Sequence, residues 1–290
     1  MKPFFKAAAI SLCAAILVGG NITRAADAPL TKQQKNEIMN VYSYDQAVID
    51  LLPEEKLKKL YNERNQILDV VKSEKYIKID IDTSDPANPK ELSVKDVPKQ
   101  EYEAYKIKQA TVPDVMPFSS TCGASGGYDC VKESWIKMET WISQTSSSNG
   151  MVSMRFEWLT KPFFTRTDVM AIGLNSGFSP IPDTEYGIYK HLGNYGWVNH
   201  EWTRAEKRDA GGYGFKFDLD NTHNKHQGYM SYNFTKNNSN AIVADAYSHY
   251  AHSQKIFSGD VSFAIPLGGS LQISKDDFDV VQGHAQKNPW

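Results

Sequence analysis

Two glutamates stand between aromatic residues in segments that alternate like strands. Glu157 is flanked by a phenylalanine and a tryptophan, and Glu201 by a histidine and a tryptophan. Glycosidic cleavage uses two carboxyl groups opposed across a sugar, and aromatic faces stack on pyranose rings. Glu157 and Glu201 are therefore candidate catalytic residues. The alternative is that both are the solvent-facing half of an ordinary strand alternation.

Histidines occur in two His-x-x-His pairs, His223 with His226 and His249 with His252. With Asp245 nearby, imidazole and carboxylate groups form a donor set that zinc and related metals accept. The candidate metal ligands are thus His223, His226, Asp245 and His249. The helical metalloprotease signature is absent, and ordinary surface histidines are the alternative, so the sequence names no cofactor.

Aromatic residues suggest a ligand-binding face. Trp135 and Trp141 lie opposite the apparent core face of their strand, and a stretch rich in glycine and asparagine carries more aromatic side chains. The second set consists of Tyr186, Tyr189, Tyr195, Trp197 and Trp202. On an open sheet such residues bind a polysaccharide by stacking. Alternatively, a two-layer fold buries one set in its core and the other beneath N-terminal helices.

Cys122 and Cys130 are separated by a glycine-rich stretch and predict a disulfide in an oxidising compartment. Closing so small a loop stabilises the fold by about 2.5 kcal/mol on the chain-entropy model. A metal or redox pair is the weaker interpretation, because two cysteines do not complete a zinc site.

The N-terminus has the three parts of a secretory signal peptide, in the order that export requires. Lys2 and Lys6 precede an apolar stretch over residues 7–18, and small residues around Ala25 and Ala26 offer a cleavage site. A membrane helix needs about 20 apolar residues, so we expect no stable membrane span. Residues 1–25 are predicted to be removed, and the protein is predicted to be secreted into the extracellular or cell-envelope space.

Charge argues against nucleic acid as a partner. The chain has 32 Lys and Arg against 34 Asp and Glu. Cleavage removes Lys2, Lys6 and Arg24, so the balance becomes 29 minus 34, or minus five. Nucleic-acid binding usually shows as a basic face, which this mildly acidic chain lacks.

Composition divides the mature chain into two regions. No tryptophan occurs from residue 27 to 113, whereas all six lie beyond residue 116 together with most of the glycine. We therefore expect a helical N-terminal segment over residues 26–114 and a β-sandwich domain over residues 115–290. The segment is interpreted as a small subdomain packed on the rest, with a shielding pro-segment as the alternative.

Spacing of apolar residues predicts the elements of the first region. Thr31–Leu52 and Pro53–Val71 repeat at three and four residues and predict a helical hairpin. Pro53 followed by two glutamates is a favourable helix start. Tyr76–Ile81 alternates like a short strand, and Pro98–Gln109 predicts a third helix.

The second region alternates with a period of two between Gly, Pro, Asn and Asp clusters, which is typical of short strands. The clearest hairpin pairs Tyr213–Leu219 with Met230–Phe234. So many strands without helical periodicity indicate a mainly β fold, an antiparallel β-sandwich that is jelly-roll-like, with barrels as the alternative. Further candidate strands cover residues 131–142, 152–158, 168–174, 186–190, 197–204, 241–250, 261–265 and 270–273.

Together these patterns predict a secreted β-sandwich protein that binds an extracellular ligand, a glycan or cell-envelope polymer. One alternative is a glycan-cleaving hydrolase or lyase that uses Glu157 and Glu201. A second alternative is a non-catalytic structural or protein-interaction protein. Many secreted sandwiches share this appearance, so the fold class does not choose among the three.

Overall fold

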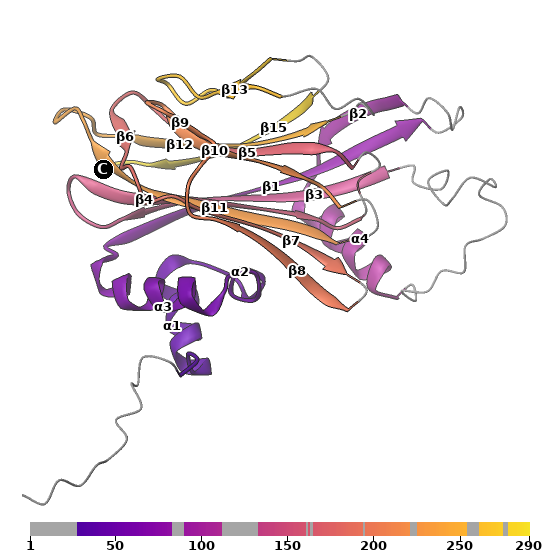
Figure 1. The fold of residues 1–290 in the computed structure, drawn as a ribbon, viewed down its shortest axis with the longest axis horizontal. Helices are drawn as coiled ribbons and strands as arrows, with labels where there is room; N and C mark the ends of the chain where they lie inside the picture. Colours follow the sequence, from indigo (N-terminus) through magenta and orange to yellow (C-terminus); the bar gives the residue numbers. More distant parts are fainter. Residues whose placement is uncertain are drawn as a thin grey trace, which may run out of the picture.

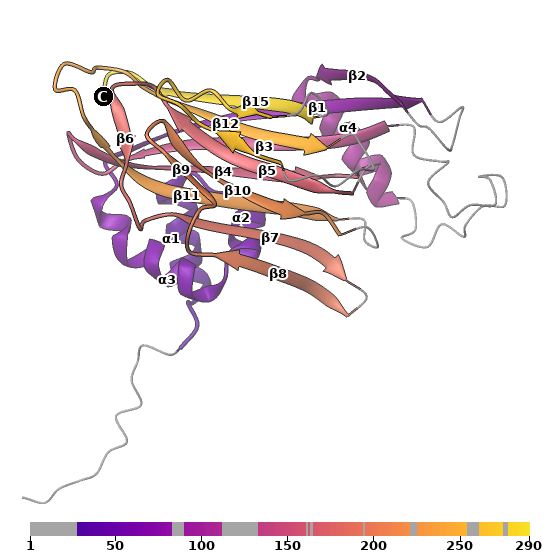
Figure 2. The same cartoon turned by 45° about the horizontal axis from the view of Figure 1, so that its top comes forward.

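The chain folds into two antiparallel sheets that lie face to face, as Figures 1 and 2 show. The mainly β class and the antiparallel sandwich are therefore confirmed. The structure, a computed structural model, describes residues 28–82, 90–111, 133–160, 162, 165–193, 195–220, 225–253, 261–274 and 278–290.

The larger sheet, sheet A, has eight strands in the order β2-β1-β3-β4-β11-β7-β8, with β6 paired to β11. Strand β1 is paired with β3 from Asp69 opposite Gln144 to Asp80 opposite Glu133. The range 26–114 thus contributes two strands to the sandwich besides its helices. The strands of sheet A are β1 Asp69–Asp82, β2 Lys90–Asp96, β3 Glu133–Gln144, β4 Asn149–Trp158, β6 Phe178–Pro180, β7 Tyr186–Gly193, β8 Gly196–Trp202 and β11 His226–Lys236.

The second sheet, sheet B, has five strands in the order β15-β12-β5-β10-β9. A two-stranded sheet, β13 (Phe263–Ala264) with β14 (Gln272–Ile273), covers its outer face through contacts of Phe263 with Val169 and Ala171. The strands of sheet B are β5 Thr167–Leu174, β9 Lys207–Asp209, β10 Gly212–Asp218, β12 Ala244–Ser253 and β15 Phe278–Lys287.

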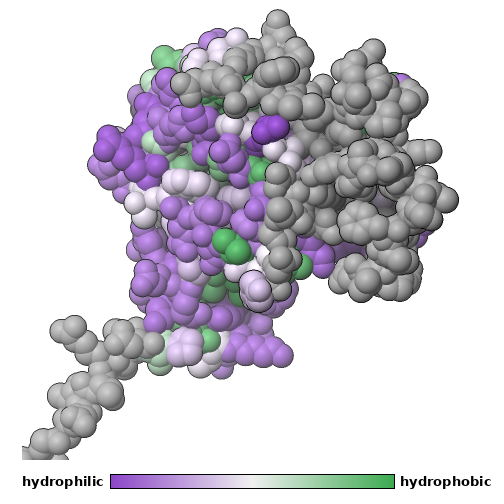
Figure 3. Space-filling model, turned by 45° about the vertical axis from the view of Figure 1, so that its right-hand side comes forward, coloured by the Kyte–Doolittle hydropathy of each residue, from purple (hydrophilic) through white to green (hydrophobic). Residues whose placement is uncertain are grey.

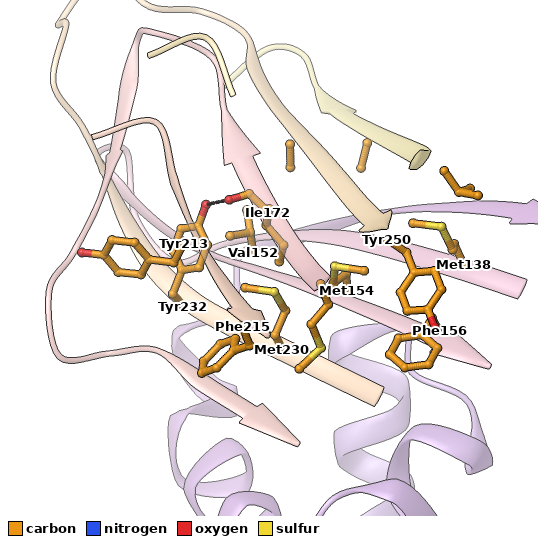
Figure 4. Packing of buried hydrophobic residues seen from close by; sticks show 14 of the residues in the cluster. Met138, Val152, Met154, Phe156, Ile172, Tyr213, Phe215, Met230, Tyr232 and Tyr250 are labelled. Carbon is orange, nitrogen blue, oxygen red and sulfur yellow. Dashed lines mark hydrogen bonds between the residues drawn. The ribbon is translucent and has the colours of Figure 1, made fainter. Parts of the chain in front are cut away.

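The space between the sheets is filled by alternate residues of both, which point inward because strand side chains alternate. Figure 4 shows methionines and aromatic rings interleaved there, with the Tyr232 hydroxyl donating to the Ile172 carbonyl at 2.9 Å. Gly228 lies under Phe156, where a Cβ atom would come within 2.3 Å of the ring. A side chain at position 228 would displace that ring from the core.

Helices cover the outer face of sheet A. Thr31 begins α1 with a capping box, in which its hydroxyl accepts from Gln34 N–H and the Gln34 side chain accepts from Thr31 N–H. Helix α4 covers a separate area, where Tyr102 packs on Tyr76 and Trp135. The helices are α1 Lys32–Tyr42, α2 Gln46–Leu51, α3 Glu54–Glu63, the 3-10 helix η1 Arg64–Gln66 and α4 Lys99–Thr111.

The predicted helix over Pro53–Val71 is too long. Helical structure ends at Gln66, and β1 begins at Asp69. The apolar residues near 67–71 fit the spacing of a helix as well as that of a strand. Pairing with β3 makes this segment a strand. The strand predicted at Tyr76–Ile81 is confirmed as part of β1, and the third predicted helix as α4.

The predicted hairpin of Tyr213–Leu219 with Met230–Phe234 is wrong. Strand β10 pairs with β5 and β9, whereas β11 pairs with β4, β6 and β7 in the other sheet. Their inward faces meet across the core, with the rings of Tyr213 and Tyr232 5.0 Å apart. The alternation identified the buried face of each strand correctly but not its neighbour.

Strand β15 was not predicted, although it forms one edge of sheet B. Its inward residues include Gly283 and Ala285, which are too small to produce an apolar alternation in the sequence. A Cβ atom at Gly283 would lie 2.5 Å from the Ser248 hydroxyl, so the small residue is required by the close approach of β12.

Some predictions fall outside the described residues. These concern the signal peptide over residues 1–25, the disulfide between Cys122 and Cys130, and the metal candidate His223. They stay predictions. Within the described ranges, no helix has the length and apolarity needed to cross a membrane.

The coloured surface in Figure 3 is mainly hydrophilic, and hydrophobic residues occur on it singly. Scattered exposed apolar residues are ordinary in a folded protein. The cavities and buried polar groups of the fold are therefore the stronger candidates for a site.

Candidate ligand-binding site

A pocket of about 200 Å³ opens between the helices and the β3–β4 turn. We call it the hairpin pocket. Its volume is below the ~300–1,000 Å³ of pockets that hold drug-sized ligands, so it suits one small unit. The residues that line it are Tyr42, Glu63, Gln66, Ile67, Thr145, Asn149, Gly150, Met151, Ile181 and Asn233.

The helical wall of the pocket is held by the packing of α1 against α3. Tyr42, in the last turn of α1, is buried and donates its hydroxyl to the Leu60 carbonyl at 3.1 Å. Leu57 and Leu60 face the sheet, and Glu63 follows at the end of α3. Burial, and then the Glu63 carboxylate, raise the pKa of Tyr42, so this phenol stays protonated at physiological pH.

The sandwich wall is shaped by a compact turn. Thr145 donates both its N–H and its hydroxyl to the Asn149 carbonyl, each at 2.9 Å. Met151 is opposite Asn233 in the β4–β11 register, so both lie on the outer face of sheet A. The Asn233 carbonyl accepts from Ile181 N–H at 2.7 Å, which places Ile181 at the rim.

Several polar groups of this pocket have no partner among the residues that the structure describes. Among the described residues, no hydrogen bond or ion pair uses the Glu63 carboxylate or the side-chain amides of Gln66, Asn149 and Asn233. Each amide offers both a donor and an acceptor. With the apolar surface of Met151, the pocket presents the mixture of polar and apolar groups that fixes a small polar ligand.

The candidate catalytic residues are not brought together. Glu157 in β4 accepts from Arg155 at 2.7 Å, and Glu201 in β8 accepts from the Tyr186 hydroxyl at 3.1 Å. Strands β11 and β7 lie between β4 and β8, so the two backbones are three strand spacings, roughly 14 Å, apart. Glycoside hydrolases separate their carboxyl groups by about 5–9.5 Å.

Most of the candidate aromatic ligand-binding residues are buried. The exposed fraction is 3% for Trp135, 0% for Trp141, 9% for Tyr186 and 1% for Tyr189. Such side chains offer no surface for stacking. The burial therefore matches the alternative in which the fold covers both sets.

Trp141 lies under the N-terminal helices, where its indole N–H donates to the Ser43 carbonyl at 3.1 Å. Trp202 packs against the core next to Phe215. Only Tyr195 and Trp197 of the predicted set are strongly exposed, at 106% and 47%.

The candidate metal ligands are also separated. His249 forms a hydrogen bond with the Gly269 carbonyl at 2.8 Å. Asp245 forms hydrogen bonds with the side chains of His284 at 2.9 Å and Gln286 at 2.8 Å. His226 lies in the other sheet, with its Nδ1 2.7 Å from the Tyr189 hydroxyl. Within the described residues, no three or more His, Cys, Asp or Glu side chains are placed to hold a metal.

The spacing of His249 and His252 explains why this pair fails as a metal site. In a strand, residues i and i+3 point to opposite faces. His249 accordingly points out of sheet B, and burial lowers its pKa. His252 points inward, with its Nδ1 3.1 Å from both Asp168 oxygens.

Asp168 is the centre of a buried polar cluster that sequence reasoning missed. It is fully buried, accepts from the Tyr250 hydroxyl, and lies 3.3 Å from Ser253 N–H. Trp158 donates its indole N–H to the Tyr250 oxygen at 2.8 Å. The cluster joins β5 and β12 to β4 at one end of the core, and nothing in the sequence linked these residues.

The pocket residues were also missed. Residues 145–149 are polar residues of the kind that occur in turns, and Glu63 lies in a segment with many charged residues, so neither stands out in the sequence as part of a site. No local signal connects the end of α3 with the β3–β4 turn, because their contact is tertiary.

Comparisons with known proteins do not identify the chain. No protein-family model matches it, and no curated protein matches it. Among solved structures, the Clostridium perfringens NetB toxin in its membrane-inserted form is similar over 57% of this chain and 93% of that chain. The identity is 9% and the TM-score 0.25, values that carry no argument about fold or function.

Proposed function

We propose that this protein binds a glycan or cell-envelope polymer and that the hairpin pocket holds one sugar unit. The observation that carries this proposal is the set of unpaired groups in the pocket, the Glu63 carboxylate with the amides of Gln66 and Asn233. Sugar hydroxyls donate and accept hydrogen bonds at once, and amide groups match them in both roles. The predicted export puts the protein where such polymers occur.

Binding without cleavage is the activity that this geometry favours. The described lining of the pocket has one carboxylate, Glu63, whereas glycosidic cleavage uses two. Glu157 and Glu201 lie too far apart to serve as that pair, as their strand separation indicates. A glycan hydrolase or lyase is therefore the less supported alternative.

The protein-interaction alternative has one observation in its favour. Strand β8 is an edge of sheet A, and its residues from Gly196 to Glu201 are all exposed. Open edges of this kind pair with extended segments of other chains unless charge or proline protects them. The pocket remains the better supported site, because β8 shows no enclosed surface.

Co-sedimentation with insoluble polysaccharides and cell-wall preparations tests the proposal. The mature protein should show saturable retention on one material, and Asn233→Ala should weaken retention about tenfold. Losing two ligand hydrogen bonds of about 0.5–1.5 kcal/mol each accounts for that factor. Because no described hydrogen bond uses the side-chain amide of Asn233, and its backbone N–H keeps its bond to the Thr184 hydroxyl, the variant should melt like the parent.

Asn199→Ala is the matched control, because Asn199 is an exposed asparagine on β8 and does not line the pocket. It should leave retention unchanged. Equal losses in both variants, or no saturable retention on any material, would contradict glycan binding at the hairpin pocket.

A further inference from the structure

Glu63 is the charged group of the hairpin pocket, and no ion pair among the described residues uses its carboxylate. Of the described residues that line the pocket, it alone carries a formal charge. Its neighbour Arg64 is engaged elsewhere, since it pairs with Glu37 at 2.9 Å and donates to the Tyr61 carbonyl at 2.7 Å. The carboxylate therefore meets a ligand as a negative charge that no ion pair of the described residues engages, although its field also acts on Lys56.

The Glu63 carboxylate acts electrostatically on nearby groups, Tyr42 and Lys56 among them. It contributes to the raised pKa of Tyr42 on the adjacent helix. Ile67, Met151 and Ile181 form apolar parts of the same lining, and low-polarity walls strengthen the field of a charge. A sugar that carries a carboxylate or sulfate would be repelled there, and a cationic one attracted.

We infer that the sugar unit in this pocket is an amino sugar with a free, protonated amine, and that Glu63 pairs with its ammonium group. The inference rests on the proposed glycan binding. A charge-assisted bond between ammonium and carboxylate is about twice as strong as a neutral one. The amides of Gln66 and Asn233 remain for the hydroxyl groups of the same ring.

Two oligosaccharides that differ only in this amine provide the test. One is an oligomer of glucosamine, and the other is the same oligomer with every amine acetylated. Calorimetric titration at a mildly acidic pH should give at least about tenfold tighter binding of the amine form to the wild-type protein. The difference should shrink with added salt, because the field of Glu63 is screened.

Glu63→Gln should remove the preference while leaving binding of the acetylated oligomer unchanged. Glu55→Gln is the matched control, because Glu55 is an exposed glutamate of the same helix that does not line the pocket, and it should keep the preference. Since Glu63 has no described partner to lose, Glu63→Gln should fold. If the variant does not fold, the titrations of the wild-type protein with the two oligomers still test whether the pocket prefers the free amine.

The outcomes separate this inference from the proposed function. Equal binding of the two oligomers, tighter binding of the acetylated one, or retention on other polysaccharides only would overturn the amino-sugar assignment and leave glycan binding intact. A wild-type protein that binds neither oligomer nor any polysaccharide would overturn both.

Discussion

Both faces of sheet A are buried along its central strands β3, β4, β11 and β7, yet by different chemistry. The inner face meets sheet B through side chains such as Met138, Phe156 and Met230, and contacts there are largely apolar. The outer face meets α1–α3 through a mixture of apolar residues and hydrogen-bonded polar groups. At the inner interface the shapes of the apolar side chains determine how the two sheets pack. At the outer interface the geometry of the hydrogen bonds also determines how the helices pack on the sheet.

The polar part of the outer interface centres on hydroxyl groups. Tyr44 lies 3.0 Å from the Ser153 hydroxyl and 2.8 Å from that of Tyr229. Lys56 of α3 reaches the same area and donates to the Ser231 hydroxyl at 3.1 Å. A buried network of this kind gives the helices one register on the sheet, because a shift would leave buried polar groups without partners.

A charged group of residues lies on the same face. Glu139 is fully buried, and three cations surround it, Lys72 at 2.7 Å, Lys137 at 2.8 Å and Arg155 at 2.9 Å. Burial of such charges is tolerated only when they are paired. The outer face therefore carries a network of several ion pairs, whereas on the inner face the paired buried charge of Asp168 lies at one end of the core.

The largest effect should come from emptying the inner face. Phe156 stacks on Phe217 at 5.7 Å and contacts Tyr250 at 4.3 Å between ring centroids. Phe156→Ala should lower the free energy of unfolding by about 3–5 kcal/mol, because it removes buried apolar contacts and leaves a cavity. Chemical denaturation measures this loss, and a change under about 1 kcal/mol would mean that the inner face is loosely packed.

Breaking the charge pairing should cost somewhat less. Glu139→Gln leaves Arg155 and Lys137 buried without their shared carboxylate, so we expect a loss of about 3 kcal/mol in the free energy of unfolding. Glu133→Gln is the control, because Glu133 forms a half-exposed ion pair with Lys78 worth about 0–1 kcal/mol. Equal losses in the two variants would show that burial of Glu139 has no energetic consequence.

Lys56 should produce the smallest effect, and one that depends on pH. Burial lowers its pKa from 10.5 to about 7, and Lys59 adds to this while Glu63 opposes it. From about pH 7 to 10.5 the unfolded chain binds a proton that the folded chain lacks, so stability increases with pH. The free energy of unfolding should rise by about 2 kcal/mol between about pH 7 and 9 through this residue.

Lys56→Met is the variant that isolates this contribution. It should flatten the pH dependence of unfolding over that window by about the same 2 kcal/mol and stabilise the protein near neutral pH. Denaturation of both proteins at several pH values provides the measurement. An unchanged pH profile would show that the Lys56 amine is not desolvated beneath α3.

Local patterns in the sequence were enough to predict the fold class and much of the element order. The alternation of Ile136 and Met138 with Trp135 and Trp141 placed these side chains on opposite faces of β3 correctly. The start of α3 after Pro53 was also predicted, because a proline and acidic residues favour a helix N-terminus locally.

Burial of the aromatic residues was not decided by those patterns. Trp141 lies on the face of sheet A that points away from the core between the two sheets, but α1–α3 cover that face. An alternation with a period of two indicates which side chains share a face of the strand. It does not indicate whether another element covers that face. The binding face predicted from exposed aromatics was for this reason largely an interior surface.

The sequence by itself thus determined much of the secondary structure and the faces of the predicted strands, since both depend on steric and hydrophobic preferences of near neighbours. Tertiary structure alone decided that β10 and β11 lie in opposite sheets and that Glu63 meets Asn233 at one pocket. Such contacts join residues far apart along the chain. They arise from the packing of whole sheets and helices, for which no short stretch of sequence carries a signal.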